Sequence, residues 1–164
     1  MLSEKMLNAL NEQVKWEIQS SYMYLGMAAW LNDKALPGFA HWMRAQAREE
    51  MEHAMKIYSF IEERGNRVEL LDIPAPAKEW KDVHDVMDKA YLHEQSVTGR
   101  INKLVDIAME ERDHATSIFL QWFVSEQVEE EDSFRSIIDK LGFIKPSCSA
   151  MLFLDKQMAG RAKD

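Results

Sequence analysis

The 164-residue sequence has little of what would indicate a disulfide-bonded or membrane-spanning protein. Its single cysteine, Cys148, excludes an internal disulfide bond and any zinc site built from paired cysteines. No run of 18 apolar residues occurs, and the first residues lack the basic and apolar segments of an export signal. We therefore expect a cytoplasmic protein without a membrane partner.

Positive charge, glycine and proline are also scarce. The formal net charge of −8 disfavours binding to the phosphate backbone of nucleic acids and favours cations as partners. Only 6 glycines and 4 prolines interrupt a chain rich in Leu, Met, Ala, Glu and Lys, which are residues that favour helix. We expect one all-α domain over residues 1–164, because this length supports one hydrophobic core and hardly two.

Apolar residues recur at three- and four-residue steps in four long segments, which predicts four long amphipathic helices. Ser3 is expected to cap the first, and Pro37 to lie in the first turn of the second. Leu25 and Met55 are among the residues expected in the core. A shorter apolar segment predicts a fifth helix near the C-terminus. In order, the five segments are residues 3–32, 37–65, 83–110, 114–142 and 150–158.

The lengths of the connections predict the topology. Helices of about 28 residues are roughly 42 Å long, and the short links after the first and the third helix predict two antiparallel hairpins. Residues 66–81, in contrast, can span on the order of 50 Å when extended. The sequence therefore predicts a four-helix bundle with a long crossover between helices two and three and a short fifth C-terminal helix.

Several polar residues fall on the apolar faces of these helices. Glu17 precedes Glu50 by 33 residues, and both lie at equal distances from the first predicted turn. Glu94 precedes Gln127 by the same 33 residues, around the second turn. Each hairpin should therefore bring its pair to one depth in the bundle. When the first hairpin is superposed on the second, His53 falls on Glu130, so these two residues join the same layer. The predicted polar layer consists of Glu17, Glu50, His53, Glu94, Gln127 and Glu130.

Buried carboxylates at one depth cannot all remain bare anions, because desolvation and repulsion would each cost several kcal/mol. Such a layer needs protons or bound cations. Oxygen-rich ligands with one imidazole favour iron or manganese over a structural zinc ion. Helical bundles with paired metals use a Glu from two helices and a Glu-x-x-His motif from the other two. Here "EMEH" supplies one such motif, and "QVEE" stands where the second would be.

At these residues the chain resembles the non-haem ferritins of the bacterial and archaeal type, from about residue 3 to residue 160. The resemblance implies a ferritin-like bundle in which Fe(II) is oxidised by O2 at a di-iron ferroxidase site within one subunit. It also implies storage of ferric oxide mineral inside a shell of twenty-four subunits. The segments that carry it are "NEQVKWEIQSSYMYL", "FAHWMRAQAREEMEHA", "LHEQ" and "FLQWFVSEQVEEE".

The resemblance also implies roles for individual residues. The first iron site corresponds to Glu17, Glu50 and His53, with Glu50 as the bridge to a second site at Glu94 and Glu130. Gln127 matches the glutamine beside the iron pair, and Tyr24 matches a tyrosine close to the first site. A third iron site corresponds to Glu49, Glu126, Glu129 and Glu130. Glu52, together with Glu49, resembles the glutamates that face the cavity and nucleate mineral.

One departure from the pattern narrows the subtype, and two alternative functions stay open. The haem-containing branch carries a second Glu-x-x-His motif, whereas Gln127 and Glu130 occupy that place here, so haem is not expected even though Met51 takes the position of its methionine ligand. A mini-ferritin or other di-iron oxidase that protects against peroxide would instead place its ligands at a subunit interface. A purely structural bundle with a vestigial carboxylate layer would bind no metal.

Overall fold

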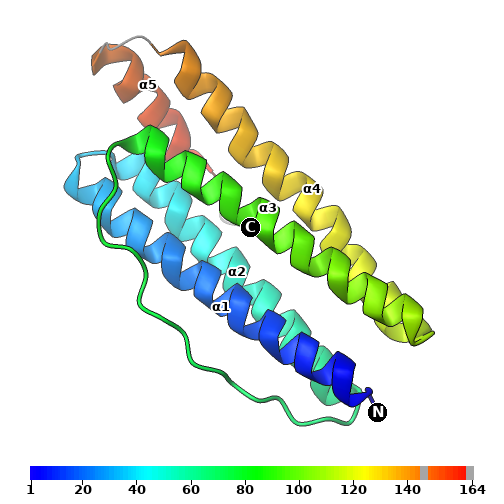
Figure 1. The fold of residues 1–164 in the computed structure, drawn as a ribbon. Coiled ribbons are helices and arrows are strands. Elements are labelled where there is room, and N and C mark those ends of the chain that lie inside the picture. The colour runs from blue at the N-terminus through cyan, green and yellow to red at the C-terminus, as the bar shows by residue number, and fades with distance from the viewer. Residues whose placement is uncertain (145–147, 162–164) are drawn as a thin grey trace.

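The structure is a computed structural model that describes residues 1–144 and 148–161. This part of the chain contains five helices (Figure 1). The all-α prediction is confirmed, and so are the two hairpins and the short C-terminal helix. None of the described helices combines the length and apolar character needed to cross a membrane. The helices are α1 (Glu4–Asp33), α2 (Pro37–Glu63), α3 (Val83–Glu110), α4 (His114–Phe143) and α5 (Cys148–Met158).

Side-chain caps fix where three of the long helices begin. Ser3 accepts a hydrogen bond from the backbone N–H of Met6 at the start of α1, as expected. Asp82 caps α3, and Asp113 caps α4 through the N–H of Thr116. Each cap satisfies an N–H group that has no partner within its own helix. The Asp113 cap thereby fixes where the turn between α3 and α4 ends.

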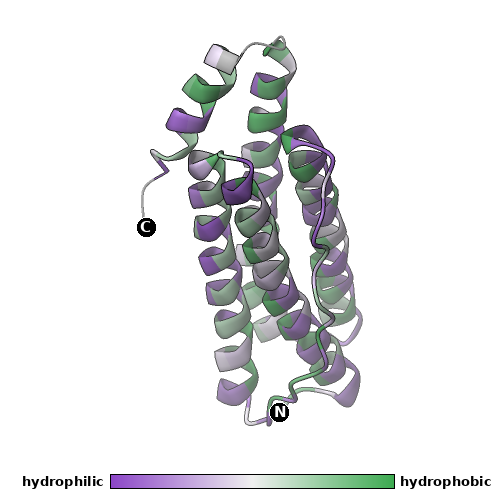
Figure 2. Ribbon diagram, turned by 90° about the vertical axis from the view of Figure 1, so that its left-hand side faces the viewer, coloured by the Kyte–Doolittle hydropathy of each residue, from purple (hydrophilic) through white to green (hydrophobic). Residues whose placement is uncertain are grey.

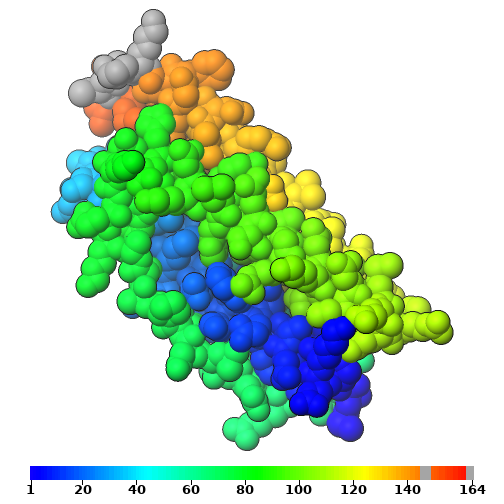
Figure 3. Space-filling model, in the orientation of Figure 1, coloured from blue at the N-terminus to red at the C-terminus, as the bar shows by residue number. Residues whose placement is uncertain are grey.

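The crossover runs in extended form along α1, from the end of α2 to the start of α3 (Figures 1 and 2). Asn11 of α1 accepts a hydrogen bond from the N–H of Glu69, and Trp30 donates to Glu79 at 3.2 Å. In the space-filling view, α3 and the crossover cover most of this face, and residues of α1 show between them (Figure 3). Helices α2 and α3 are therefore parallel, as the crossover length predicted.

Two hydrophobic clusters fill the bundle. One surrounds Phe39 and Phe134 near the start of α2, and the other surrounds Ile57 and Phe123 toward its end. Leu25 and Met55 were wrongly expected in the core, since they are 48% and 49% exposed. Both lie beside the inward stripe: α1 buries positions 21, 24 and 28, and α2 buries positions 50, 53 and 57. A three- or four-residue step alone does not fix where the edge of such a stripe falls.

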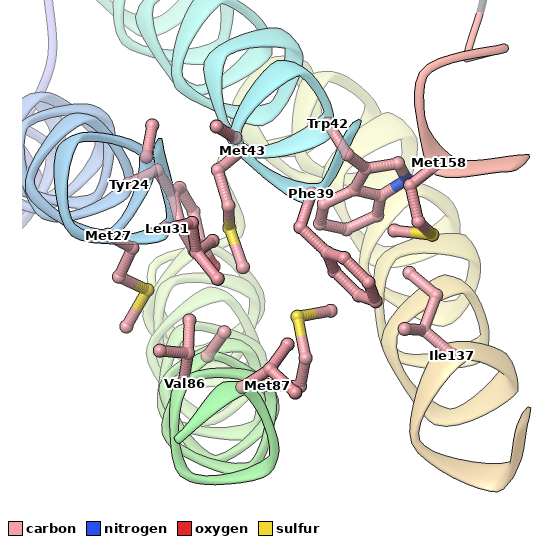
Figure 4. Close-up of a cluster of buried hydrophobic side chains, with 14 of the residues drawn as sticks. Tyr24, Met27, Leu31, Phe39, Trp42, Met43, Val86, Met87, Ile137 and Met158 are labelled. Carbon is pink, nitrogen blue, oxygen red and sulfur yellow. The ribbon is translucent and has the colours of Figure 1, made fainter. Parts of the chain in front are cut away.

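Helix α5 packs against the first turn of α2, and this contact requires a glycine. A Cβ atom at Gly38 would lie 1.7 Å from the backbone oxygen of Asp155, which is too close for any side chain. Asp155 Oδ1 also accepts a hydrogen bond of 2.9 Å from the N–H of Phe39. Met158 of α5 lies beside Trp42 in the first cluster (Figure 4). The segment after α5 is thereby held close to α2.

Candidate metal centre

A layer of polar side chains separates the two hydrophobic clusters. Its members come from all four long helices, and each is at most 5% exposed. The two pairs of equal spacing thus reach the interior, as the positions of the turns predicted. The members are Glu17, Glu50, His53, Glu94, Gln127 and Glu130.

The first group of candidate ligands lies on α1 and α2. Glu17, Glu50 and His53 each offer one ligand atom, and these three atoms lie within 4.8 Å of one another. His53 Nδ1 is 3.6 Å from Glu50 Oε2, because residues three apart share one helix face. Glu17 Oε2 is buried and has no hydrogen-bond partner in the described parts of the chain. A buried carboxylate oxygen without a partner fits a position that binds a cation.

Glu94 on α3 is held by hydrogen bonds from two other helices. The Tyr24 hydroxyl donates to Glu94 Oε1, and Gln127 Nε2 donates to Glu94 Oε2 at 3.1 Å. Gln127 thus lies beside Glu94, the candidate ligand of the second site. The Tyr24 hydroxyl bonds the same carboxylate, and the expected place of Tyr24 close to the first site stays a prediction.

Two buried glutamines support the candidate ligands, and the sequence reasoning assigned neither a role. Gln13 Nε2 donates to Glu17 Oε1 at 2.8 Å, and Gln46 Nε2 donates to Glu130 Oε2 at 2.7 Å and to Glu50 Oε1 at 3.2 Å. A signal was present in the sequence. Each glutamine precedes its glutamate by four residues, so the Gln-x-x-x-Glu pattern recurs at the same spacing of 33.

A second group joins α2 to α4. His53, Glu126 and Glu130 each place one ligand atom within 4.8 Å of the others. Glu126 and Glu130 are two of the residues expected at a third iron site. Glu49 lies half-buried and forms an ion pair with Arg161, which the sequence did not predict. Glu52 and Glu129 are exposed and belong to neither group among the described residues.

An aromatic side chain covers the open side of His53. The Trp122 ring meets the His53 ring edge to face at 5.3 Å, and the ammonium group of Lys56 lies 3.7 Å from the Trp122 ring centroid. Trp122 is 38% exposed, so it lies partly at the surface. Because Trp122 bridges the surface and His53, it restricts the orientation of the imidazole.

Burial and mutual repulsion favour the protonated form of this layer when no cation is bound. Burial raises the pKa of Glu94 to about 7 and the pKa of Glu130 to about 8. The pKa of Glu50 lies well above its ordinary value because of burial and then repulsion from Glu94, Glu17 and Glu130. Burial also raises the pKa of Glu17. Bound cations would remove this penalty and release the protons.

Comparison with known proteins assigns the chain to a family. The ferritin-like domain matches residues 7–144. The bacterial non-heme ferritin of Staphylococcus haemolyticus is 40% identical over 164 residues, which cover 100% of this chain and 99% of that protein. The chain belongs to the ferritin family. The bacterial non-heme ferritin of an Escherichia coli strain is 38% identical to this ferritin over 97% of the chain and 96% of that protein.

Solved archaeal ferritins have the same fold as this ferritin. The open-pore ferritin of Archaeoglobus fulgidus is 48% identical, with a TM-score of 0.97 over 98% of each chain. An engineered closed form of that ferritin is 47% identical, with a TM-score of 0.98 over 100% of each chain. The predicted resemblance to non-haem ferritins is thereby confirmed, and with it the general function of an iron-storing ferroxidase.

Proposed function

We propose that the buried carboxylate layer is the ferroxidase centre of this ferritin and that Fe(II) and O2 are its substrates. The first Fe(II) binds at Glu17, Glu50 and His53. The second binds at Glu94 and Glu130, with Glu50 as the bridge. The observation that carries this assignment is the layer of buried carboxylates from both hairpins, in which Glu17 Oε2 has no hydrogen-bond partner among the described residues.

The residues of the layer suit oxidation of Fe(II) followed by release of Fe(III). Hard carboxylate oxygens stabilise Fe(III) over Fe(II), and a bridging Glu50 holds two ions close enough to give one electron each to the same O2 molecule. Gln127 is neutral, so it orients Glu94 without adding a charge that would retain the product. Tyr24 holds the other oxygen of Glu94.

The third site gives Fe(III) a path away from the pair. Its proposed ligands are Glu49, Glu126, Glu129 and Glu130. Glu130 belongs to both the pair and the third site, and its grouping with Glu126 and His53 supports such a transfer. Glu52 is exposed on α2 and would nucleate mineral, together with Glu49, beyond this path.

We further propose that the chain assembles into a cage of twenty-four subunits in the cytoplasm. Phe143, Leu152 and Phe153 support assembly, because they are 87%, 60% and 66% exposed beside the junction of α4 and α5. The relatives described as open-pore and as engineered closed ferritins suggest two packing geometries for such a cage. We do not expect the chain to bind haem. A mini-ferritin is less favoured, because both groups of candidate ligands lie within one chain.

Oxygen uptake tests this function directly. Fe(II) added to the metal-free protein in air-saturated buffer should consume O2 in a fast phase that saturates at two Fe(II) ions per subunit. Protein loaded beforehand with Zn(II) is the control, since Zn(II) occupies the same ligands without changing its oxidation state. No uptake above that of buffer alone would contradict the assignment.

Particle mass distinguishes the leading function from the mini-ferritin. Twenty-four subunits of 19.1 kDa give a particle of about 460 kDa, and twelve give about half of that. Sedimentation should be measured before and after iron loading and at low and high salt, because an open cage held by polar contacts depends on ionic strength.

A further inference from the structure

The guanidinium group of Arg161 lies at the edge of the carboxylate layer. Nη2 pairs with Glu49 Oε2, and Nη1 donates a hydrogen bond of 2.8 Å to Gln46 Oε1. The group also lies over the Trp42 ring, 4.4 Å from the ring centroid. An ion pair, a neutral hydrogen bond and a cation–π contact therefore fix this one side chain.

Gln46 connects Arg161 to the candidate ligands. Because Arg161 only donates hydrogen bonds, the amide oxygen of Gln46 must face it, and the NH2 group must face Glu50 and Glu130. Gln46 is 0% exposed, so no bulk water competes for these bonds. Arg161 thereby determines the orientation in which Gln46 presents its donors to the layer.

Glu49 cannot serve Arg161 and a metal ion equally. Its Oε2 is paired with Arg161, yet its carboxylate is one of the proposed ligands of the third iron site. We propose that Arg161 is a positioning residue that controls occupancy of the third site, because it holds Glu49 until an incoming cation displaces it. This inference rests on the proposed function, since it requires the third site.

The surroundings of Arg161 allow such a displacement without unfolding. A cavity of about 400 Å³ lies between α4 and the C-terminal segment, and Arg161, Trp42, Asp132 and Ser136 are among the residues that line it. A displaced guanidinium can turn into this cavity, where Asp132, which also pairs with Arg135, offers carboxylate oxygens. The contact of Asp155 with the start of α2 keeps Arg161 nearby, so it competes as an intramolecular ligand at high effective concentration.

Zn(II) binding to the metal-free assembled protein tests the proposal. Calorimetry should resolve the sites into classes by affinity, with the two sites of the proposed pair as the tighter classes and the third iron site as the weakest. Arg161→Gln should strengthen the weakest class about fivefold, which is the upper end for a partly exposed ion pair. It should change the two tighter classes less than this, because Arg161 reaches their ligands only through Gln46. Arg161→Lys should lie between, because it keeps the charge without the planar fork. Lys156→Gln is the matched control, since it removes an exposed positive charge from α5.

A second substitution separates competition from loss of structure. Glu49→Gln should abolish the third class, and adding Arg161→Gln should then not restore it. If a third class of Zn(II) site appears only in Arg161→Gln, this also supports the proposal. The proposal is overturned if Arg161→Gln weakens the third class or leaves it unchanged, or if Arg161→Gln and Lys156→Gln shift all classes alike. It is also overturned if neither the wild-type protein nor Arg161→Gln has a third class. If the wild-type protein bound no Zn(II) at all, the proposed function itself would fail.

Discussion

Glu50→Ala lowers the rate of the fast phase of Fe(II) oxidation by about 100-fold or more. Loss of a residue that only supports a metal ligand commonly costs 10- to 100-fold, and Glu50 is proposed to bind both ions. The variant should still fold, because it removes a carboxylate that burial and repulsion disfavour. Stopped-flow absorbance at two Fe(II) ions per subunit measures the rate.

Two further variants make the Glu50 result specific. Glu62→Ala removes an exposed carboxylate from the same helix and should leave the rate unchanged. Glu50→Gln preserves the shape of the side chain, so it separates loss of the bridge from creation of a cavity; we expect it to be nearly as slow as Glu50→Ala. A fast phase of normal rate in either Glu50 variant would show that the bridge is elsewhere.

Raising the pH from 6.5 to 8.5 lowers the free energy of unfolding of the metal-free protein by about 3 kcal/mol per subunit, or roughly 10 °C in Tm. The folded pKa values of Glu94 and Glu130 are about 7 and about 8, above the ordinary value of 4.5. Such groups stabilise the fold fully below their unfolded pKa and lose that contribution as the pH rises through the folded pKa. The loss therefore falls within this window.

Other shifted groups do not reverse this dependence. Burial lowers the pKa of His93 to about 4, so the contribution of His93 to stability is lost progressively as the pH falls through its ordinary value of 6.5 toward 4. Hydrogen bonds from Arg64 and Thr116 outweigh burial and lower the pKa of Asp113 to about 2, which matters only in acid. Asp113 does not titrate between pH 6.5 and pH 8.5 in either state. Unfolded His93 loses about half a proton over this window, which adds about 0.4 kcal/mol of stability as the pH rises and offsets only a small part of the loss.

Thermal unfolding of chelator-treated protein at fixed concentration checks the pH prediction, because assembly makes Tm depend on concentration. Glu130→Gln should flatten the dependence, whereas Glu63→Gln, on the exposed side of α2, should not. Zn(II) should raise Tm more at pH 8.5 than at pH 6.5, since the ligands must lose their protons to bind it. A Tm of the metal-free protein that stays constant or rises over this range would contradict the raised pKa values.

The sequence predicted the bundle and the carboxylate layer because both depend on regular spacing. The step of three and four residues places Glu17 and Glu50 on inward faces, and the turn between α1 and α2 brings them to one depth. Both effects operate along a helix or across one short turn. The separation of 33 residues was therefore enough to align the pair of residues within each hairpin.

Contacts between segments far apart in the chain could not be predicted in this way. Arg161 reaches Glu49 across 112 positions, and this contact depends on how α5 packs against Gly38. The hydrogen bond from the Tyr24 hydroxyl to Glu94 likewise joins residues 70 positions apart. Leu25 and Met55 lie at the edges of their helical stripes, where burial depends on the neighbouring helix rather than on periodicity. Rotation and packing of whole helices are not encoded in local spacing.

Anomalous diffraction at the iron absorption edge tests the central claim most directly. Crystals soaked with Fe(II) without oxygen should show two peaks, one on each side of the Glu50 carboxylate. One peak should lie within bonding distance of Glu17 and His53, and the other within bonding distance of Glu94 and Glu130. Iron bound only at exposed carboxylates such as Glu52 and Glu129, with none between the two hydrophobic clusters, would contradict the account.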